Sequence, residues 1–190
     1  NLLVNRNKPP FDNEMLRRAM TLALDRQGMI DIVSSGRSNI AGAMMPLPEG
    51  AWGMPKEMLM ALPGYGDEPA KRQAEARKIM ESLGYGPNKR LKVKVSTRDF
   101  QAFKDPAVLL VDQLNKIHFD AELDVIESSL WYNRLFKKDY SVALNLAGAG
   151  AFDGLEPNRR RVKWEIGLRY RPVNTQIRLS LPVYQDMVEL

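Results

Sequence analysis

The sequence has no cysteine, and this absence excludes several kinds of chemistry. Disulfide bonds, thiolate nucleophiles and cysteine-based metal centres all require a thiol. No apolar run approaches the roughly 18 residues that a membrane-spanning helix needs. No signal-peptide pattern opens the chain, because strand-like sequence follows Asn1 directly. A chain that opens on Asn without Met is expected to have been processed or cut out of something longer.

The common catalytic motifs are also missing. The sequence holds no Gly-x-Ser-x-Gly elbow, no His-Glu-x-x-His and no Gly-x-x-x-x-Gly-Lys-Ser/Thr loop. Gly148 and Gly150 are not followed by the third glycine and the helix of a dinucleotide loop. The single histidine, His118, has no second His, no Cys and no paired carboxylates with which to bind a metal. We therefore predict a binding protein, not an enzyme, with no cofactor and no metal.

The charge balance gives little support to a nucleic-acid partner. There are 28 basic and 23 acidic residues among 190, for a net charge of +5, and the two signs are interspersed. The run Arg159-Arg160-Arg161 is the exception. Such a run is more typical of a solvated helix start than of a phosphate contact.

The stretch 91–153 organises the chain, because strand-like and helix-like periods alternate along it. Apolar and polar residues alternate with period two over 91–97 and 119–125, and 140–146 is a mostly apolar run. Helical spacing fills the intervals 108–117 and 128–137. The order β-α-β-α-β predicts an α/β fold with a mixed, mostly parallel sheet flanked by helices.

Capping residues set the expected helix starts in this stretch. Asp105 is expected to cap the first helix, with Pro106 at the first helical position. Ser128 or Ser129 is expected to cap the second helix.

The part before residue 91 predicts a short strand at 2–4 followed by helices. Asp12 is the expected cap of a helix that turns Arg17, Arg18 and Thr21 toward water. A second short helix ends at Gly36.

A third helix opens at Pro69 and ends at Gly84, with one apolar face. Its charged face is expected to include Arg72.

The segment 37–68 is a long, glycine- and proline-rich loop with little expected regular structure. Its portion 44–60 carries several Met residues and Trp52, which are too apolar to be left in water. One hypothesis is therefore a stand-alone α/β interaction domain that uses 44–60 as a protein-binding surface.

Short motifs spaced along most of the chain resemble a known family, and no one of them is specific alone. They are Lys8-Pro9-Pro10-Phe11-Asp12, 16–20, 23–26, 74–80, 83–85, 91–97, 112–117, 138–144 and Asp153-Gly154-Leu155-Glu156-Pro157. In this order and spacing they resemble the second lobe of the peptide/nickel-type (family 5) solute-binding proteins of ABC importers.

The resemblance implies a two-lobed periplasmic or lipid-anchored receptor that closes around its ligand and delivers it to a membrane permease. It implies that residues 1–158 are the second lobe, of the periplasmic-binding-protein-like type II fold, whose partner is a first lobe of the same protein. Peptides or peptide-like solutes are the expected ligands. Residues 159–190 depart from the family pattern, as though a deletion preceded them, and form a C-terminal extension.

The candidate ligand-binding residues lie where the strands end, since ligands of such sheets bind outside the carboxyl ends. Asp153 is the first: in oligopeptide-binding members of the family the matching acid pairs with the ligand's amino terminus, and otherwise Asp153 is a turn residue. Arg98 suits a ligand carboxylate, or alternatively a surface salt bridge to Asp99 or Asp105.

Four further candidates have equally simple alternatives. Gly148 and Gly150 allow a ligand close to the backbone, or merely permit a turn. Phe100 and Trp131 are candidate hydrophobic contacts, although a core or interface role suits them better.

Overall fold

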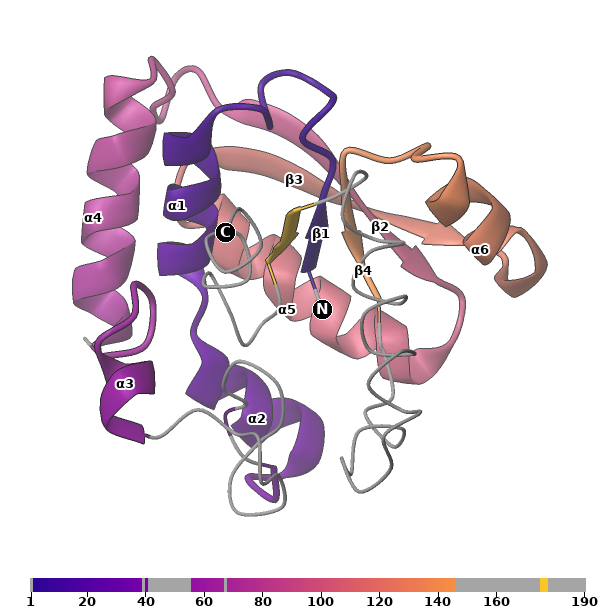
Figure 1. Cartoon of the computed structure of the whole chain (residues 1–190), viewed down its shortest axis with the longest axis horizontal. Coiled ribbons are helices and arrows are strands. Elements are labelled where there is room, and N and C mark those ends of the chain that lie inside the picture. The colour runs from indigo at the N-terminus through magenta and orange to yellow at the C-terminus, as the bar shows by residue number, and fades with distance from the viewer. Residues whose placement is uncertain (1, 39, 41–55, 67, 146–174, 178–190) are drawn as a thin grey trace, which may run out of the picture.

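The computed structural model describes residues 2–38, 40, 56–66, 68–145 and 175–177 (Figure 1). Within residues 91–144 strands and helices alternate as the sequence predicts for an α/β fold. The elements are β1 (Leu2–Val4), α1 (Glu14–Ala23), α2 (Arg26–Ser34), α3 (Lys56–Met60), α4 (Pro69–Ser82), β2 (Leu91–Arg98), α5 (Gln101–Asn115), β3 (Phe119–Ile126), α6 (Ser128–Phe136), β4 (Val142–Leu144) and β5 (Thr175–Ile177).

The strands form one mixed, mostly parallel sheet in the order β3-β2-β4-β1-β5. Strand β2 lies next to the edge strand β3 and pairs in parallel with β3 on one side and with β4 on the other. Strand β1 pairs antiparallel with β4, and β5 pairs antiparallel with β1. The chain therefore crosses from β2 to the edge strand β3 and then returns past β2 to β4.

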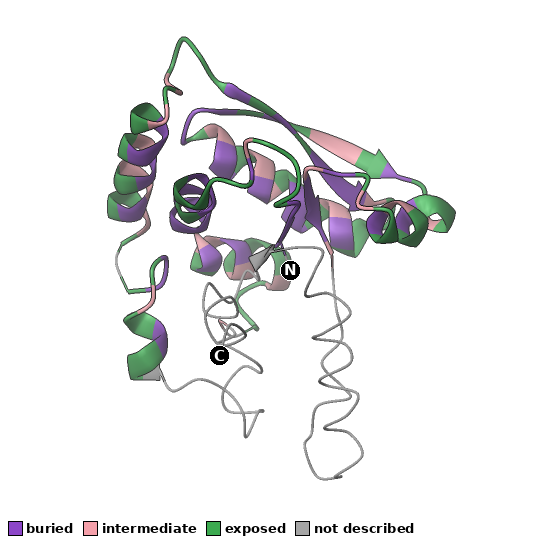
Figure 2. Cartoon of the chain, turned by 45° about the horizontal axis from the view of Figure 1, so that its top comes forward, coloured by how far each residue is buried: buried purple, intermediate pink, exposed green. Residues whose placement is uncertain are grey.

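The two crossover helices cover different faces of this sheet. The larger core joins α5 and α1 to Leu2, Val4, Val142 and Leu144. A smaller core joins α6 to Leu3, Ala143 and Ile126. Because neighbouring residues of a strand point to opposite faces, these two cores lie on opposite sides of the sheet. Figure 2 shows the buried residues of α1 and α5 turned toward the strands.

Most of the predicted elements are confirmed, including the opening strand and the parallel β2–β3 pair. Helix α4 opens at Pro69, and Gly84 follows it with a positive φ of 84°, which suits a residue without a Cβ. No helix in the described part of the chain is both long enough and apolar enough to span a membrane.

The predicted helix caps were wrong in three places. Asn13, not Asp12, caps α1, because its side-chain oxygen accepts hydrogen bonds from the backbone N–H groups of Met15 and Leu16. Helix α5 begins at Gln101 and contains Pro106 in its interior. Because proline has no backbone N–H, the helix lacks one intrahelical hydrogen bond at this position.

The third wrong cap lies at α6. This helix has Glu127 at its N-cap position, without a side-chain capping bond, and Ser128 is its first residue. The Ser129 hydroxyl donates to a carboxylate oxygen of Glu127. Neither serine caps the helix as predicted.

Three polar side chains predicted to face water are buried instead: Arg17, Thr21 and Arg72. The Arg17 guanidinium donates to the carbonyl oxygens of Phe11 and Asp12, at 3.0 and 2.7 Å. Arg72 donates to the carbonyl of Leu24 at 2.9 Å. These charge-assisted bonds to backbone carbonyls compensate for burial of the guanidinium groups. Arg17 thereby holds the segment before α1 against that helix, and Arg72 joins α4 to the end of α1.

Candidate functional site

The carboxyl ends of β2, β3 and β4 lie side by side, as the α/β prediction requires. Arg98, the last residue of β2, stands opposite Ile126, the last residue of β3. Thr97 stands opposite Leu144, the last residue of β4. The backbone N–H of Asp99 donates to the Ile126 carbonyl at 2.7 Å and so extends the pairing by one bond. This edge, defined here as 97–100, 126–128 and 144–145, is the candidate site.

The guanidinium of Arg98 has defined contacts at this edge. Its Nε donates to the hydroxyl oxygen of Ser128 at 2.9 Å. The centre of the guanidinium lies 5.7 Å from the ring centroid of Phe103 and 5.9 Å from that of Tyr132. These distances fall within the range of cation–π attraction. Arg98 is thus held by one hydrogen bond and by rings from two different helices.

The surface salt bridge expected as the alternative for Arg98 is not formed with either acid. Asp99 pairs instead with Lys104, at 2.9 Å. Asp105 accepts a hydrogen bond from the side-chain amide of Gln101. Within the described residues no carboxylate lies in ion-pair contact with Arg98. Its charge therefore remains available to an anionic ligand.

Phe100 and Trp131 lie in contrasting surroundings. Phe100 is 57% exposed and stands edge-on to Phe103 with ring centroids 6.2 Å apart. Trp131 is 1% exposed and belongs to the core between α6 and the sheet. Its indole N–H donates to the side-chain oxygen of Asn145 at 3.1 Å. A ligand contact stays a prediction for both, and only Phe100 presents its ring to solvent.

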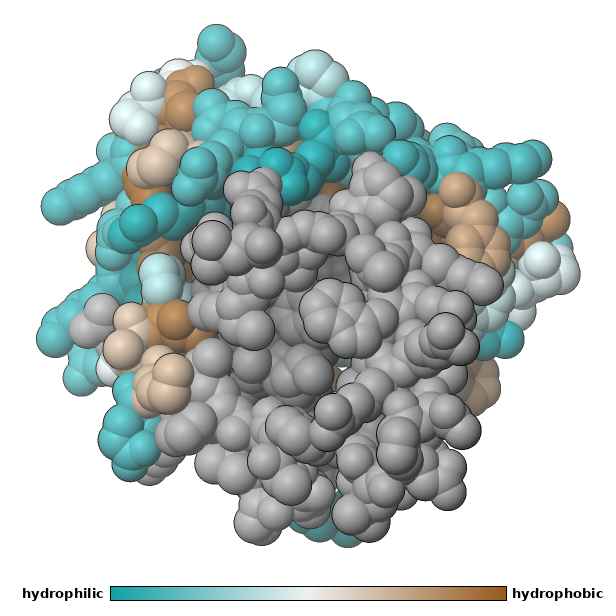
Figure 3. Space-filling model, viewed as in Figure 1, coloured by the Kyte–Doolittle hydropathy of each residue, from teal (hydrophilic) through white to brown (hydrophobic). Residues whose placement is uncertain are grey.

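Apolar side chains also gather on the outer surface of α6. Leu130, Tyr132 and Phe136 are each more than two-fifths exposed, and the rings of Tyr132 and Phe136 are stacked. Figure 3 shows apolar colour over α6, at the right of the molecule. An apolar surface therefore adjoins the charged strand ends.

The remaining candidates lie outside the described residues. They are Gly148, Gly150 and Asp153, which follow β4 in the sequence. Their assignment as ligand-binding residues stays a prediction. The same holds for Trp52 and most of the Met-rich segment 44–60.

No cluster of metal-binding side chains occurs among the residues that the structure describes. His118 is buried, and its Nε2 faces a carboxylate oxygen of Glu81 at 3.3 Å. This contact joins the start of β3 to α4, away from the strand ends.

The clear pKa shifts also belong to residues away from the strand ends. Burial lowers the pKa of the Arg17 and Arg26 guanidinium groups and raises the pKa of the Tyr65 phenol. Arg26 donates to the Gly64 carbonyl at 2.7 Å and lies 4.1 Å from the centroid of the Tyr65 ring. This group fastens the segment before α4 to α2 and has a structural role.

Ser128, Phe103 and Tyr132 are the site residues that the sequence did not reveal. Ser128 was predicted as a helix cap, and the aromatic residues had no distinguishing pattern. The position of Arg98 after a strand was a usable signal. Its partners follow only from the β2–β3 register, which brings the start of α6 beside the end of β2.

The class of the protein follows from its similarity to known sequences. The family described as bacterial extracellular solute-binding proteins, family 5 Middle, matches residues 1–160. This match covers most of the chain. The chain belongs to family 5 of the bacterial extracellular solute-binding proteins.

Two curated relatives are periplasmic binding proteins. The probable D,D-dipeptide-binding periplasmic protein DdpA of Escherichia coli is 27% identical over 146 residues, which are 75% of this chain and 25% of that protein. The periplasmic oligopeptide-binding protein OppA of Haemophilus influenzae is 34% identical over 95 residues, 48% of this chain and 16% of OppA. The chain spans about a quarter or less of these relatives.

Solved structures agree with this family assignment. The crystal structure of Haemophilus influenzae OppA in complex with RPPGFSPFR matches with a TM-score of 0.63 and 25% identity, over 76% of this chain and 28% of that one. The Escherichia coli murein tripeptide binding protein MppA matches with a TM-score of 0.67 and 18% identity, over 83% and 30% of the two chains. The second similarity supports the fold alone.

Proposed function

We propose that this chain is one lobe of the solute-binding component of an ABC importer, and that the complete receptor binds peptides or peptide-like solutes. The observation that carries the proposal is the family 5 match over residues 1–160. The curated relatives DdpA and OppA are named for binding D,D-dipeptides and oligopeptides. The chemistry at the strand ends suits such ligands, since it combines a cation with exposed apolar surface.

Each end of a peptide has a candidate partner in this proposal. Arg98 would receive a carboxylate, because no acid among the described residues neutralises its charge. Asp153 would receive the amino terminus, as the family resemblance implies. Phe100 would contact an apolar side chain, with Trp131, Gly148 and Gly150 as further candidate contacts.

The proposal also assigns this chain to one part of the complete receptor. Residues 1–158 would form the second lobe and 159–190 an extension. A first lobe of the same receptor would close over the strand ends and supply the remaining ligand contacts. The receptor would work in the periplasm or at the outer surface of the membrane and pass its ligand to an ABC permease. We expect the isolated lobe to bind weakly, because half of the contacts would be missing.

The test is isothermal titration of the full product of the gene that encodes this chain, first with a peptide pool and then with single peptides. Saturable binding at one peptide per receptor is the expected result. Peptides recovered afterwards should be intact by mass spectrometry, because the proposed role is binding without turnover. Failure of every peptide to bind would overturn the peptide assignment, and cleavage of the peptide would overturn the receptor role.

A protein-interaction domain built on residues 44–60 is less well supported, since family membership favours the receptor. The same titration separates the two hypotheses. A receptor binds short peptides regardless of any protein partner.

A further inference from the structure

Ser128 has a role at the strand ends that its position in α6 does not require. It is the first residue of α6, and Glu127 holds the N-cap position, so the Ser128 hydroxyl does not cap its own helix. Its hydroxyl instead accepts a hydrogen bond from Nε of Arg98 at 2.9 Å and donates to the carbonyl oxygen of Asp99 at 3.2 Å. One hydroxyl therefore joins the start of α6 to two consecutive residues at the end of β2.

This contact fixes which part of the Arg98 guanidinium faces a ligand. A guanidinium can pair with a carboxylate through two parallel hydrogen bonds, either from Nε and one Nη or from both Nη nitrogens. Because Nε of Arg98 already donates to the Ser128 hydroxyl, it is not available for the pairing that uses Nε and one Nη. In the described part of the chain neither Nη nitrogen of Arg98 has a hydrogen-bond partner. The pair of Nη groups is the free, two-point donor.

The surroundings of the guanidinium strengthen this arrangement. Phe103 is 7% exposed and lies on α5, whereas Tyr132 lies on α6, so the cation lies near rings of two helices. The nearby acids are engaged elsewhere: Asp99 by Lys104, and Glu127 by the hydroxyl of Ser129. A cation close to aromatic rings and without a carboxylate partner favours an incoming anion.

We propose that Ser128 is a positioning residue, which orients Arg98 so that its two Nη groups receive a ligand carboxylate end-on. The proposal rests on the receptor function above and deepens it, because it makes a free carboxylate a determinant of specificity. A peptide acid would be preferred over the corresponding peptide amide. The carboxylate accepts two charge-assisted bonds, whereas a terminal amide offers a single neutral acceptor.

The experiment measures this preference as a ratio of dissociation constants. The full receptor is titrated with one bound peptide as its free acid and as its C-terminal amide. We expect the wild type to favour the acid by about tenfold or more, as the loss of a charge-assisted bond implies. In Ser128→Ala the ratio should fall by about fivefold, while affinity for the amide changes little. Ser128→Thr keeps the hydroxyl and should restore the ratio.

The matched control is Ser129→Ala, one residue further along α6. The Ser129 hydroxyl bonds to Glu127 and does not contact Arg98. This variant should keep the wild-type ratio, so that a general effect of removing a serine from the first turn is excluded. An unchanged ratio in Ser128→Ala would overturn the proposal while leaving the receptor function intact, since peptides would still bind.

A second measurement tests the contact without any ligand. The Nε–H of Arg98 is followed by nitrogen-15 NMR in the wild type, Ser128→Ala and Ser129→Ala. Hydrogen exchange of this N–H should accelerate in Ser128→Ala alone, because the bond to the hydroxyl is lost. Equal exchange rates in all three proteins would contradict the hydrogen bond between Arg98 Nε and the Ser128 hydroxyl. If this hydrogen bond is present but no peptide binds, the receptor function is overturned, and the proposed positioning role of Ser128 is overturned as well.

Discussion

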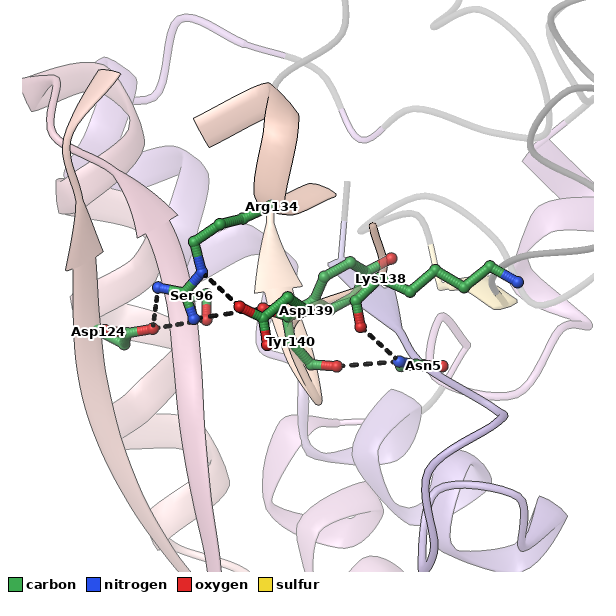
Figure 4. A network of polar contacts seen from close by, with 7 residues as sticks. All are labelled: Asn5, Ser96, Asp124, Arg134, Lys138, Asp139 and Tyr140. Atoms are coloured by element: carbon green, nitrogen blue, oxygen red, sulfur yellow. Dashed lines mark hydrogen bonds and ion pairs between the residues drawn. The ribbon is translucent and has the colours of Figure 1, made fainter. Parts of the chain in front are cut away.

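The side-chain amide of Asn5 donates to the carbonyl oxygen of Tyr140 at 3.0 Å, although the two residues lie 135 positions apart. The same nitrogen donates to the carbonyl oxygen of Lys138 at 3.0 Å (Figure 4). The backbone N–H of Asn5 donates to the carbonyl oxygen of Ser141 at 2.9 Å. Asn5 is 1% exposed. These bonds fasten the end of β1 to the turn that leads into β4, and so hold the antiparallel part of the sheet against its parallel part.

Asn5→Ala should therefore lower the free energy of unfolding by about 2 kcal/mol, because two carbonyl oxygens lose their donor in a region that excludes water. Urea unfolding followed by circular dichroism measures the change. Asn7→Ala is the control: Asn7 is exposed, and its hydrogen bond to the side-chain oxygen of Asn5 comes from its backbone N–H, which the substitution keeps. A loss below about 0.5 kcal/mol in Asn5→Ala, equal to that of an ordinary surface change, would contradict this view of the contact.

The strands could be predicted from the sequence because burial of one face leaves a direct pattern. In β2 the apolar residues Leu91, Val93 and Val95 are buried, and Lys92 and Lys94 between them are exposed. Arg17 and Arg72 leave no such pattern. Their acceptors are backbone carbonyls of other segments, and every residue carries a carbonyl, so a sequence cannot show which arginine finds one.

The candidate site likewise has one residue that the sequence indicates, Arg98, and one whose role only the structure shows, Ser128. Arg98 could be found because it follows a predicted strand in a predicted parallel sheet. The role of Ser128 follows from where α6 begins: Glu127 holds the N-cap position, and the Ser128 hydroxyl bonds to the neighbouring strand. The local sequence favours capping, whereas the β2–β3 register brings Arg98 within 2.9 Å.

The contrast between Phe100 and Trp131 predicts opposite effects of their substitution. Trp131→Phe should lower the free energy of unfolding by about 1–3 kcal/mol, because a smaller ring leaves space in a closed core. It should change peptide affinity little. Phe100→Ala should do the reverse: affinity weakens by about fivefold or more, and stability changes by less than about 1 kcal/mol.

Unfolding and titration experiments on both variants measure the two effects. Equal losses of affinity would place the Trp131 side chain in the ligand's path as well. Unchanged affinity in Phe100→Ala would remove this residue from the site.

The buried phenol of Tyr65 predicts a loss of stability at alkaline pH. An unfolded tyrosine loses its proton near pH 10, about its ordinary pKa. Burial raises the pKa of Tyr65 in the fold, although the neighbouring Arg26 charge acts in the opposite direction. Above about pH 10 the unfolded state therefore binds fewer protons than the folded one, and stability falls as the pH rises through the folded pKa.

Urea midpoints at pH 8, 9, 10 and 11 measure this decline. Because lysines and the other tyrosines titrate in the same range, the informative quantity is the difference from Tyr65→Phe. The variant should lose less stability than the wild type between pH 9 and 11. Parallel curves for the two proteins would show that the Tyr65 phenol ionises as easily in the fold as in the unfolded chain.

Asp153→Asn tests the part of the site that comes from the family resemblance. If Asp153 pairs with the amino terminus of a peptide, the substitution replaces a charge-assisted bond by a neutral one, and binding should weaken by about 1.5 kcal/mol or more. Acetylation of the peptide removes the same charge from the other side. The acetylated peptide should therefore bind the wild type weakly and discriminate little between the wild type and Asp153→Asn.

Asp105→Asn removes the same charge from an exposed position of α5 and should leave the affinity unchanged. Titrations of the three proteins with the free and acetylated peptide give the coupling between the carboxylate and the ammonium group. A coupling near zero would mean that Asp153 is a turn residue and that another group receives the amino terminus. A coupling above about 1 kcal/mol would show a direct charge contact, because an ordinary exposed pair contributes less.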